Sequence, residues 1–513
     1  MKTKATLLLI NLLLVSLLTL FIVSEPVYAQ SYYHIVFDDF ETDSGLWTLE
    51  TQGTSWSAGR ATDQAYSGSY SYKISWPPED NSAPGDYAAI TTTFEIDVTN
   101  TYQLSLWVRD SYTGGTSGYH FKQVLVDGEV VWEDDVAGDE GGWIHVTANL
   151  TLNPGQHNLT LRVYEKKGVS NFAIDVWFDL VELKIETITV QIDLVAAITS
   201  LQSSDYFQAT YFYGGQSQTA QLVNGTNTLT IDKGTWIYVE QLSHLSNSTH
   251  RWAMNSTFNE TFTEDATRIL YYWYQVSITI QVETVTSGTD LNSSNYIQAL
   301  YQNFGQNALT PELYDGTSVS IWADNGTVLE VNETSSASSS THRWITLDDT
   351  TQTITQNGTY IFSYYEQYYA TISVTKADPD FVSTDSSNYF TATGTVNGST
   401  QVSFSPLYEG NSISKWLDAG STLTIDSTST GSNENEIWDI VDTSWTVTDT
   451  SHTFYYWDHL KVSLYPQISK PYSQSLTSDN YATVTYTSYG SNFTTHVWIN
   501  DTNPSIWVCL LYT

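Results

Sequence analysis

The residues of this chain best suited to chemistry are aromatic side chains near its beginning. A pyranose ring lays its C–H face on a flat aromatic ring, while planar polar side chains hydrogen-bond its hydroxyl groups. Suitable rings and partners occur together at Trp56, Trp76, Trp107, Arg109, Tyr119, Gln123, Trp132 and Trp143. This set predicts a carbohydrate-binding surface.

The sequence around Trp107 shows how a strand would present such a ring. Leu104, Leu106 and Val108 alternate with other residues and share one face of a strand. Trp107 and Arg109 share the other face. If the aliphatic face packs in a core, Trp107 lies on the opposite, solvent-facing surface. The alternative is that these aromatic side chains are ordinary core or rim packing.

Motifs for catalysis do not occur in the sequence. It has no nucleophile elbow, zinc-binding helix motif or phosphate loop. A carboxylate pair for glycoside hydrolysis depends on tertiary distances that a sequence does not give. Four histidines recur in drifting copies of one motif or near its end, and we interpret them as structural: His250, His342, His452 and His459. We predict that the protein is not an enzyme and has no catalytic residues.

Short alternating strands must position the aromatic residues. Residues 33–183 show apolar alternation broken by Gly, Pro, Asn and Asp, with no sustained helical period. Asp127-Gly128 is a good two-residue hairpin turn, since both positions tolerate positive φ. About nine strands are expected, which predicts a two-sheet jelly roll. The predicted strands span residues 35–40, 70–75, 88–96, 103–109, 123–126, 130–133, 143–150, 156–164 and 173–183.

The remaining chain repeats with a period near 92 residues. A Ser-Ser-Asn-Tyr-like motif ends at Tyr206, Tyr296, Tyr389 and Tyr481, and tryptophans keep the same step. Units of this length with Gly turns fit immunoglobulin-like β-sandwiches. The fold class is therefore all-β. We predict a signal peptide at 1–29, the jelly roll at 30–185, repeats at 186–275, 276–367 and 368–459, and an incomplete repeat at 460–513. The repeats have no linkers, so the array should be stiff.

The fourth repeat stops just after Trp507, which matches Trp322 and Trp416 of the earlier repeats. A half-sandwich exposes an apolar face and an unpaired edge. One explanation is a partial gene. The other is completion by a strand from another chain, which would make the protein self-associate into a filament.

Charge and the first residues indicate the compartment. The 56 acidic residues outnumber 18 basic ones, giving a net charge of −38, so nucleic acid is excluded as a partner. Lys2 and Lys4 precede an apolar run, and small residues before Gln30 form a signal-peptidase site. We predict a secreted or cell-surface protein, with an uncleaved membrane anchor as the alternative. The single cysteine, Cys509, allows no intrachain disulfide.

Asn-x-Ser/Thr sequons support an exported glycoprotein. There are thirteen, at Asn149, Asn158, Asn224, Asn247, Asn255, Asn259, Asn292, Asn325, Asn332, Asn357, Asn397, Asn492 and Asn500.

The order of short motifs in the first unit resembles a known family. These motifs are residues 37–41 (FDDFE) with Trp47, 65–74 (AYSGSYSYKI), 102–108, 152–157 (LNPGQH) and 178–183 (FDLVEL). Together they are similar to the jelly-roll carbohydrate-binding modules of cellulases, xylanases and laminarinases. The resemblance covers about 30% of the chain. The Tyr- and Thr-rich repeats resemble domains of archaeal surface proteins.

The family resemblance also implies a structural calcium ion. In that family, acidic residues near both chain ends and carbonyl groups of the Ser-Gly segment hold the ion. Carried over, the resemblance implies Asp39 or Glu41 together with Asp179 as ligands, with carbonyl groups near residues 66–68. Calcium prefers such hard oxygen ligands and would join chain ends that no disulfide holds. The alternative is that these are surface carboxylates at strand ends.

Three functions remain open. The first is a binding protein whose jelly roll holds a polysaccharide or cell-surface glycan on a stalk of repeats. The second is a structural surface-layer, adhesin or filament subunit without a sugar site. The third is the non-catalytic portion of a larger secreted glycoside hydrolase.

Overall fold

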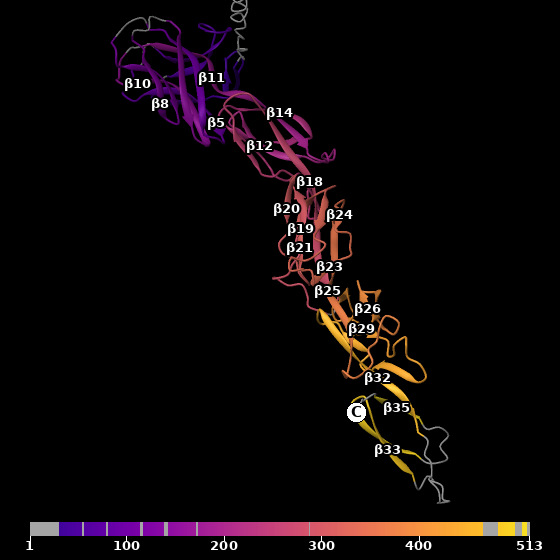
Figure 1. Ribbon diagram of the computed structural model, residues 1–513. Coiled ribbons are helices and arrows are strands. Elements are labelled where there is room, and N and C mark those ends of the chain that lie inside the picture. Colours follow the sequence, from indigo (N-terminus) through magenta and orange to yellow (C-terminus); the bar gives the residue numbers. More distant parts are fainter. Residues whose placement is uncertain are drawn as a thin grey trace, which may run out of the picture. The chain divides into compact units, whose positions relative to one another are not determined.

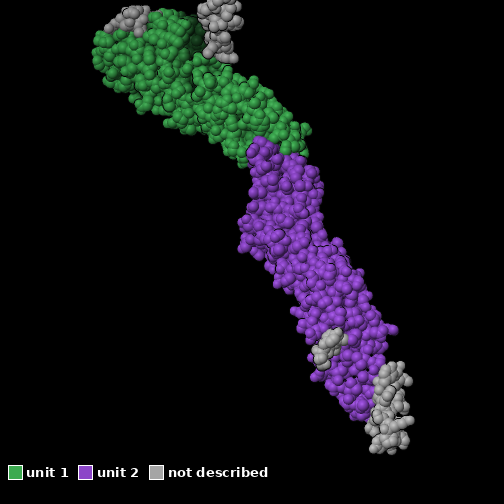
Figure 2. All heavy atoms as spheres, in the orientation of Figure 1, with its two compact units in different colours: residues 1–245, 252–272 green, residues 246–251, 273–513 purple. Residues whose placement is uncertain are grey.

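The computed structural model describes residues 30–53, 56–77, 81–112, 116–137, 142–170, 173–286, 288–464, 481–497 and 505–509. These residues contain strands and turns and no helix, which confirms the predicted all-β class. Consequently, the described part of the chain offers no helix of the length and apolarity that crossing a membrane requires. The chain divides into two compact units, residues 1–245 with 252–272 and residues 246–251 with 273–513 (Figure 2). The predicted signal peptide lies outside the described residues.

The first unit begins with a sandwich of two sheets (Figure 1). One is five-stranded, in the order β2-β5-β10-β7-β8. In the other, β11 pairs with β4 and β1 on one side and with β6 on the other, while β3 and β9 extend it. The strands are β1 (Ser31–Asp38), β2 (Thr48–Gln52), β3 (Ser57–Ala61), β4 (Ser71–Trp76), β5 (Tyr87–Ile96), β6 (Asn100–Asp110), β7 (His120–Val126), β8 (Glu129–Asp135), β9 (Ile144–Leu152), β10 (Gly155–Glu165) and β11 (Ile174–Ala196).

Alternation builds this sandwich as predicted. Ile90 of β5, Leu106 of β6 and Leu161 of β10 are fully buried in one core between the sheets. All nine predicted strands form, and the sequence analysis missed β2 and β3. The hairpin between β7 and β8 turns at Asp127 and Gly128, whose φ angles are 54° and 83°. Both positive angles are those of the predicted turn.

Each complete repeat is also a two-sheet sandwich. In every one, the two long strands that enter and leave it pair in parallel, and a separate four-stranded sheet faces them: β13-β12-β15-β17, β20-β19-β22-β24 and β27-β26-β29-β31. The strands of the first repeat are β12 (Phe207–Tyr213), β13 (Gln216–Leu222), β14 (Gly225–Asp232), β15 (Trp236–Val239), β16 (His250–Ala253), β17 (Phe258–Thr261) and β18 (Ala266–Thr284).

The later repeats use the same scheme. Their strands are β19 (Ala299–Asn303), β20 (Gln306–Leu309), β21 (Ser318–Asp324), β22 (Val328–Val331), β23 (His342–Thr346), β24 (Thr351–Thr353), β25 (Gly358–Lys376), β26 (Phe390–Val396), β27 (Thr400–Leu407), β28 (Ser412–Asp418), β29 (Thr422–Ile425), β30 (Glu436–Ile440), β31 (Ser444–Thr446), β32 (Ser451–Ser463), β33 (Ala482–Ser488), β34 (Ser491–Val497) and β35 (Ser505–Cys509). The described part of the fourth repeat contains β33, β34 and β35.

Single strands are shared by consecutive domains. The first half of β11 belongs to the N-terminal sandwich, and its second half pairs with β14 and β18 of the first repeat. Likewise, β25 pairs with β18 and β23 before it pairs with β28 and β32. The predicted domain boundaries therefore fall inside continuous strands, where the sequence analysis expected two strands meeting.

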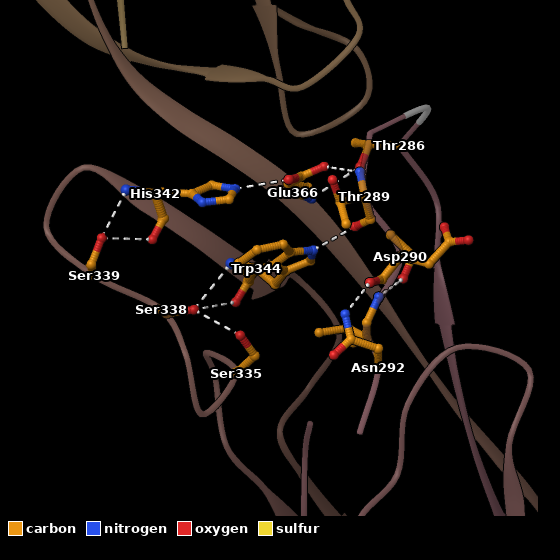
Figure 3. Close-up of polar contacts among 12 residues, drawn as sticks. Thr286, Thr289, Asp290, Asn292, Ser335, Ser338, Ser339, His342, Trp344 and Glu366 are labelled. Carbon is orange, nitrogen blue, oxygen red and sulfur yellow. Dashed lines mark hydrogen bonds and ion pairs between the residues drawn. The ribbon is translucent and has the colours of Figure 1, made fainter. Parts of the chain in front are cut away.

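The recurring Thr-His-Arg-Trp motif has a packing role. His342 Nε2 lies 2.8 Å from Oε1 of the fully buried Glu366 (Figure 3). The His342 ring stacks on that of Tyr368, with the ring centres 4.3 Å apart. The indole N–H of Trp344 donates to the carbonyl of Thr289 at 2.9 Å. These contacts close a loop of the second repeat over its core, in agreement with the structural interpretation of His342.

Candidate functional site on the N-terminal sandwich

The outer face of the five-stranded sheet brings together polar residues that are far apart in sequence. Along β10, Leu161 and Val163 face the core, so Arg162 between them faces outward. In register, Arg162 lies between Ala89 of β5 and Gln123 of β7. The four strands therefore place one row of side chains across the sheet, which continues to Glu133 of β8.

A second row flanks the first. Tyr164 of β10 lies opposite Tyr87 of β5, one step along the sheet on the same outer face. The guanidinium of Arg162 lies 4.9 Å from the ring centre of Tyr164 and 5.6 Å from that of Tyr87. We define the tyrosine–arginine face as Tyr87, Gln123, Glu133, Arg162 and Tyr164.

Hydrogen bonds fix the polar row. Arg162 Nε donates to Gln123 Oε1 at 2.8 Å, and Gln123 Nε2 donates to Glu133 Oε2 at 3.0 Å. Gln123 is 4% exposed although it points outward. Burial lowers the pKa of Arg162, but a guanidinium remains charged in proteins. The row thus presents planar donors and acceptors that are already oriented.

Apolar and polar groups lie side by side on this face. Ala89, in register with Arg162, is 1% exposed, so its methyl group is covered by its neighbours. The two tyrosine rings supply apolar surface with a hydroxyl at the edge. Together these groups can stack on a sugar ring and bond its hydroxyl groups, the chemistry expected of a carbohydrate-binding surface.

The predicted residues Trp107, Arg109 and Trp143 lie on the outer face of the other sheet. Trp107 stacks on Tyr66, with ring centres 3.7 Å apart and an interplanar angle of 12°. It also stacks on His145, with ring centres 4.5 Å apart and an interplanar angle of 13°. Trp143 meets Tyr66 edge-on at 6.0 Å. Because Tyr66 and His145 both stack on Trp107, its ring offers little free face to a sugar.

The other predicted aromatic residues lie elsewhere. Trp76 is 2% exposed in the core and packs edge-on against Trp56 at 4.3 Å. Trp56 and Trp132 are partly buried against the same core. Tyr119 lines a separate 230 Å³ pocket with Tyr112 and His120. The structure therefore does not gather the predicted aromatic side chains into one groove.

Sequence analysis missed most of the tyrosine–arginine face. The sequence pattern predicts Gln123 as a hydroxyl partner but does not indicate Tyr87, Arg162 or Tyr164. The signal was present as alternation, because Thr160, Arg162 and Tyr164 are the polar positions of a strand that was predicted. The sequence analysis concentrated on tryptophan side chains and therefore did not identify these tyrosines and this arginine.

The predicted calcium ligands meet the predicted Ser-Gly segment, but through its N–H groups. Asp179 Oδ2 accepts the N–H groups of Tyr66 and Ser67 at 2.6 and 3.0 Å. Glu41 Oε1 accepts those of Ser69 and Tyr70, both at 2.7 Å. Burial raises the pKa of Asp179, the backbone N–H groups oppose this, and the Glu41 charge adds to it.

A calcium ion needs several oxygen ligands directed at one point, whereas the contacts of these carboxylates given above are to N–H groups. Asp39 Oδ1 likewise accepts a backbone N–H group, that of Glu41, at 3.1 Å. Within the described ranges, no three acidic, histidine or cysteine side chains group as metal ligands. The calcium ion stays a prediction, and carboxylate-to-N–H bonds hold the segment.

Replacing Asp179 with alanine should test these alternatives. We expect a loss of about 2–4 kcal/mol in the free energy of unfolding, because the part-buried N–H groups of Tyr66 and Ser67 lose a buried, charged acceptor. The exposed Asp43 is the matched control, and Asp43→Ala should change little. Chelation with EDTA should leave the melting temperature of the wild-type chain unchanged. A fall of several degrees that added calcium reverses would instead support the ion.

The sequons lie mostly on the surface. Asn325 and Asn397 are only partly exposed, and Asn397 Oδ1 accepts a hydrogen bond from Gln367 at 2.8 Å. Asn500 lies outside the described residues. The other sequon asparagines are exposed: Asn149, Asn158, Asn224, Asn247, Asn255, Asn259, Asn292, Asn332, Asn357 and Asn492. Glycosylation at these positions remains a prediction.

No protein-family model matches the chain, and no curated protein matches it. Among solved structures, it is similar to a family 61 carbohydrate-binding module complexed with β-1,4-galactotriose, at 17% identity, covering 27% of this chain and 86% of the module with a TM-score of 0.20.

Two further structures show likeness of the same order. The CBM22-1 xylan-binding domain of Xyn10C from Paenibacillus barcinonensis is 14% identical, covering 30% of this chain and 96% of the domain with a TM-score of 0.22. The K1 adhesin domain of Lys-gingipain from Porphyromonas gingivalis is 14% identical, covering 30% and 97% with a TM-score of 0.22. The resemblance of the repeats to archaeal surface proteins stays a prediction.

Proposed function

We propose that the N-terminal sandwich binds a polysaccharide through the tyrosine–arginine face. The observation that carries this is the hydrogen-bonded row of Arg162, Gln123 and Glu133 between strands, beside the facing rings of Tyr87 and Tyr164. Such a row binds hydroxyl groups without further ordering of its side chains, which lowers the entropic cost of binding. The ligand should be neutral, because a chain of net charge −38 repels acidic polymers.

The repeats would carry this binding sandwich away from the cell or the site of attachment. Continuous strands such as β25 leave no flexible segment between the second and third repeats, which supports a stalk. Export through residues 1–29 and glycosylation at the exposed sequons complete the proposal. In this role the N-terminal sandwich binds its ligand without catalysis.

Arg162→Ala should weaken binding of the full mature chain to its polysaccharide roughly 10- to 100-fold. The reason is that hydrogen bonds to charged groups contribute about 1.5–3 kcal/mol. Affinity gel electrophoresis against galactan, xylan and mixed-linkage glucan measures the dissociation constants. The full chain is needed, because a cut at residue 185 would divide β11.

Trp107→Ala is the control on the opposite sheet and should leave retention unchanged. Loss of binding in Trp107→Ala with normal binding in Arg162→Ala would move the site to the tryptophan-bearing face. Absence of retention on every neutral polysaccharide would favour the structural role, in which the sandwich only caps the repeats.

A further inference from the structure

The second and third repeats carry different residues at one matched pair of positions. In the second repeat these residues are His342 of β23 and Glu366 of β25, whose Nε2 and Oε1 atoms lie 2.8 Å apart (Figure 3). The imidazole thus gives the fully buried Glu366 carboxylate a hydrogen-bonding partner that can also carry a positive charge.

In the third repeat, both members of the pair are acidic. Strand β30 pairs with β32 in the register in which β23 pairs with β25, so Trp438 lies opposite Asp458 as Trp344 lies opposite Glu366. Two residues before Trp438, Glu436 takes the position of the histidine. Two carboxyl groups therefore meet where the second repeat pairs a carboxylate with an imidazole.

Asp458 is buried, and one of its carboxylate oxygens has no partner. The residue is 0% exposed, and its Oδ2 accepts the N–H of Val382 at 3.2 Å, much as Glu366 Oε2 accepts the N–H of Thr289. Because the other oxygen of Glu366 contacts the histidine, Oδ1 is the oxygen of Asp458 on the side of Glu436. Among the described residues, this buried oxygen has no hydrogen-bond partner. Leaving a buried carboxylate oxygen unsatisfied is costly, which indicates a bound group at this point.

The two carboxyl groups repel each other. Burial raises the pKa of Glu436, and the charge of Asp458 raises it further, so the two groups are close. Burial also raises the pKa of Asp458, while the N–H of Val382 and the charge of His459, next in the chain, oppose this. Lys376, on the neighbouring strand β25, donates instead to a backbone carbonyl oxygen at 3.0 Å. A further positive charge between the two carboxylates would relieve the repulsion.

This pair has the chemistry of a weak site for a hard divalent cation. Carboxylate oxygens are the ligands that calcium prefers, and water can complete a coordination shell that the protein begins. Glu436 is partly exposed, so an ion can enter from solvent and keep part of its water. The net charge of −38 also concentrates cations near the protein surface.

We propose that Glu436 and Asp458 bind a divalent cation such as calcium, which joins β30 to β32 as the histidine–glutamate pair joins β23 to β25 in the second repeat. With two protein ligands, the dissociation constant should be on the order of 10⁻⁴–10⁻³ M, the range of weak extracellular calcium sites. A site this weak is empty in buffer without added calcium, so chelation does not affect it. The ion must be added to be detected.

Hydrogen exchange of the full mature chain, with and without added calcium chloride, tests the site locally. Binding slows exchange that requires opening of the site by the factor 1 + [Ca²⁺]/Kd, which is about 10- to 100-fold at roughly 10 mM calcium. We expect this protection in β30 and β32 and no change in β23, which separates the ion from one bound in the N-terminal sandwich.

Three variants test the ligands. Glu436→Gln should abolish the calcium response, because it removes one of the two carboxylates. Glu436→His should protect β30 without calcium and abolish the response, because it rebuilds the pair of the second repeat. Glu434→Gln changes an exposed glutamate two residues away and is the matched control, which should keep the full response.

Unchanged exchange of β30 and β32 in the wild-type chain with calcium would overturn the proposal, whether or not a variant folds. A response that persists in Glu436→Gln, or that sodium chloride of equal ionic strength reproduces, would also overturn it, since it would reflect screening of the acidic surface. Protection that increases at about pH 5, after correction for intrinsic exchange rates, but not with calcium at about pH 7 would show that Glu436 and Asp458 share a proton instead.

Discussion

Lys122→Met should lower the stability of the N-terminal sandwich by about 3–5 kcal/mol. Lys122 and Asp110 are both fully buried, and their Nζ and Oδ2 atoms lie 2.7 Å apart. The same ammonium reaches Asp134 Oδ2 at 2.9 Å. Without the lysine, the carboxylate of Asp110 is left inside the sandwich with no opposing charge, which is the costly outcome of breaking a buried ion pair.

Hydrogen exchange of β6 and β7 measures this loss locally, without interference from the unfolding of the repeats. The double variant Lys122→Met with Asp110→Leu should recover much of the stability, since apolar pairs often replace buried ion pairs at little cost. Lys166→Met, at an exposed lysine 4.8 Å from the ring of Phe121, is the control. A loss below about 1 kcal/mol in the single variant would contradict the expectation.

Asp418→Ala should destabilise the third repeat by about 3 kcal/mol or more. Its carboxylate, 3% exposed, accepts the N–H groups of Asn397 and Gly398 at 2.9 and 2.6 Å and the amide of Gln367 at 2.9 Å. One buried donor, the Gln367 amide, and two part-buried N–H groups would lose a charged acceptor, and hydrogen bonds to charged groups contribute about 1.5–3 kcal/mol each. Because Gln367 lies on the strand shared with the second repeat, the loss should reach both repeats.

Urea unfolding of the full chain, followed by hydrogen exchange in β26 and β28, reports the effect. The control is Asp426→Ala, which removes an exposed carboxylate of the same repeat. If the third repeat alone lost protection while β25 remained protected throughout, the coupling between the two repeats would be refuted.

Much of the fold followed from residue patterns. Alternation located Leu104, Leu106 and Val108 in the core, and Asp127-Gly128 identified a hairpin. Short polar strands such as β2, which is exposed at every position, carry no alternation of burial and were missed. The shared strands were also missed as such, because alternation continues unbroken through a boundary and marks no end.

The candidate site was harder to predict, for a physical reason. Alternation tells which face of a strand Arg162 occupies, but it does not tell which residues of other strands lie beside it. The row across the sheet contains Ala89, Gln123 and Glu133 besides Arg162. Only the register between β5, β10, β7 and β8 aligns these residues. Trp107 shows the converse, since its outward face was predicted and its stacking with Tyr66 and His145 was not.

The shared strand β25 determines how the second and third repeats would bear tension along the chain. Its first part pairs in parallel with β18 over residues 358–364, and its last part pairs in parallel with β32 over residues 371–376. Stretching would slide these partners past each other, so all the bonds of a pair resist at once rather than opening one by one. Mechanical strength would then reside in the backbone between consecutive domains, where ordinary multidomain chains have flexible linkers crossed by few contacts.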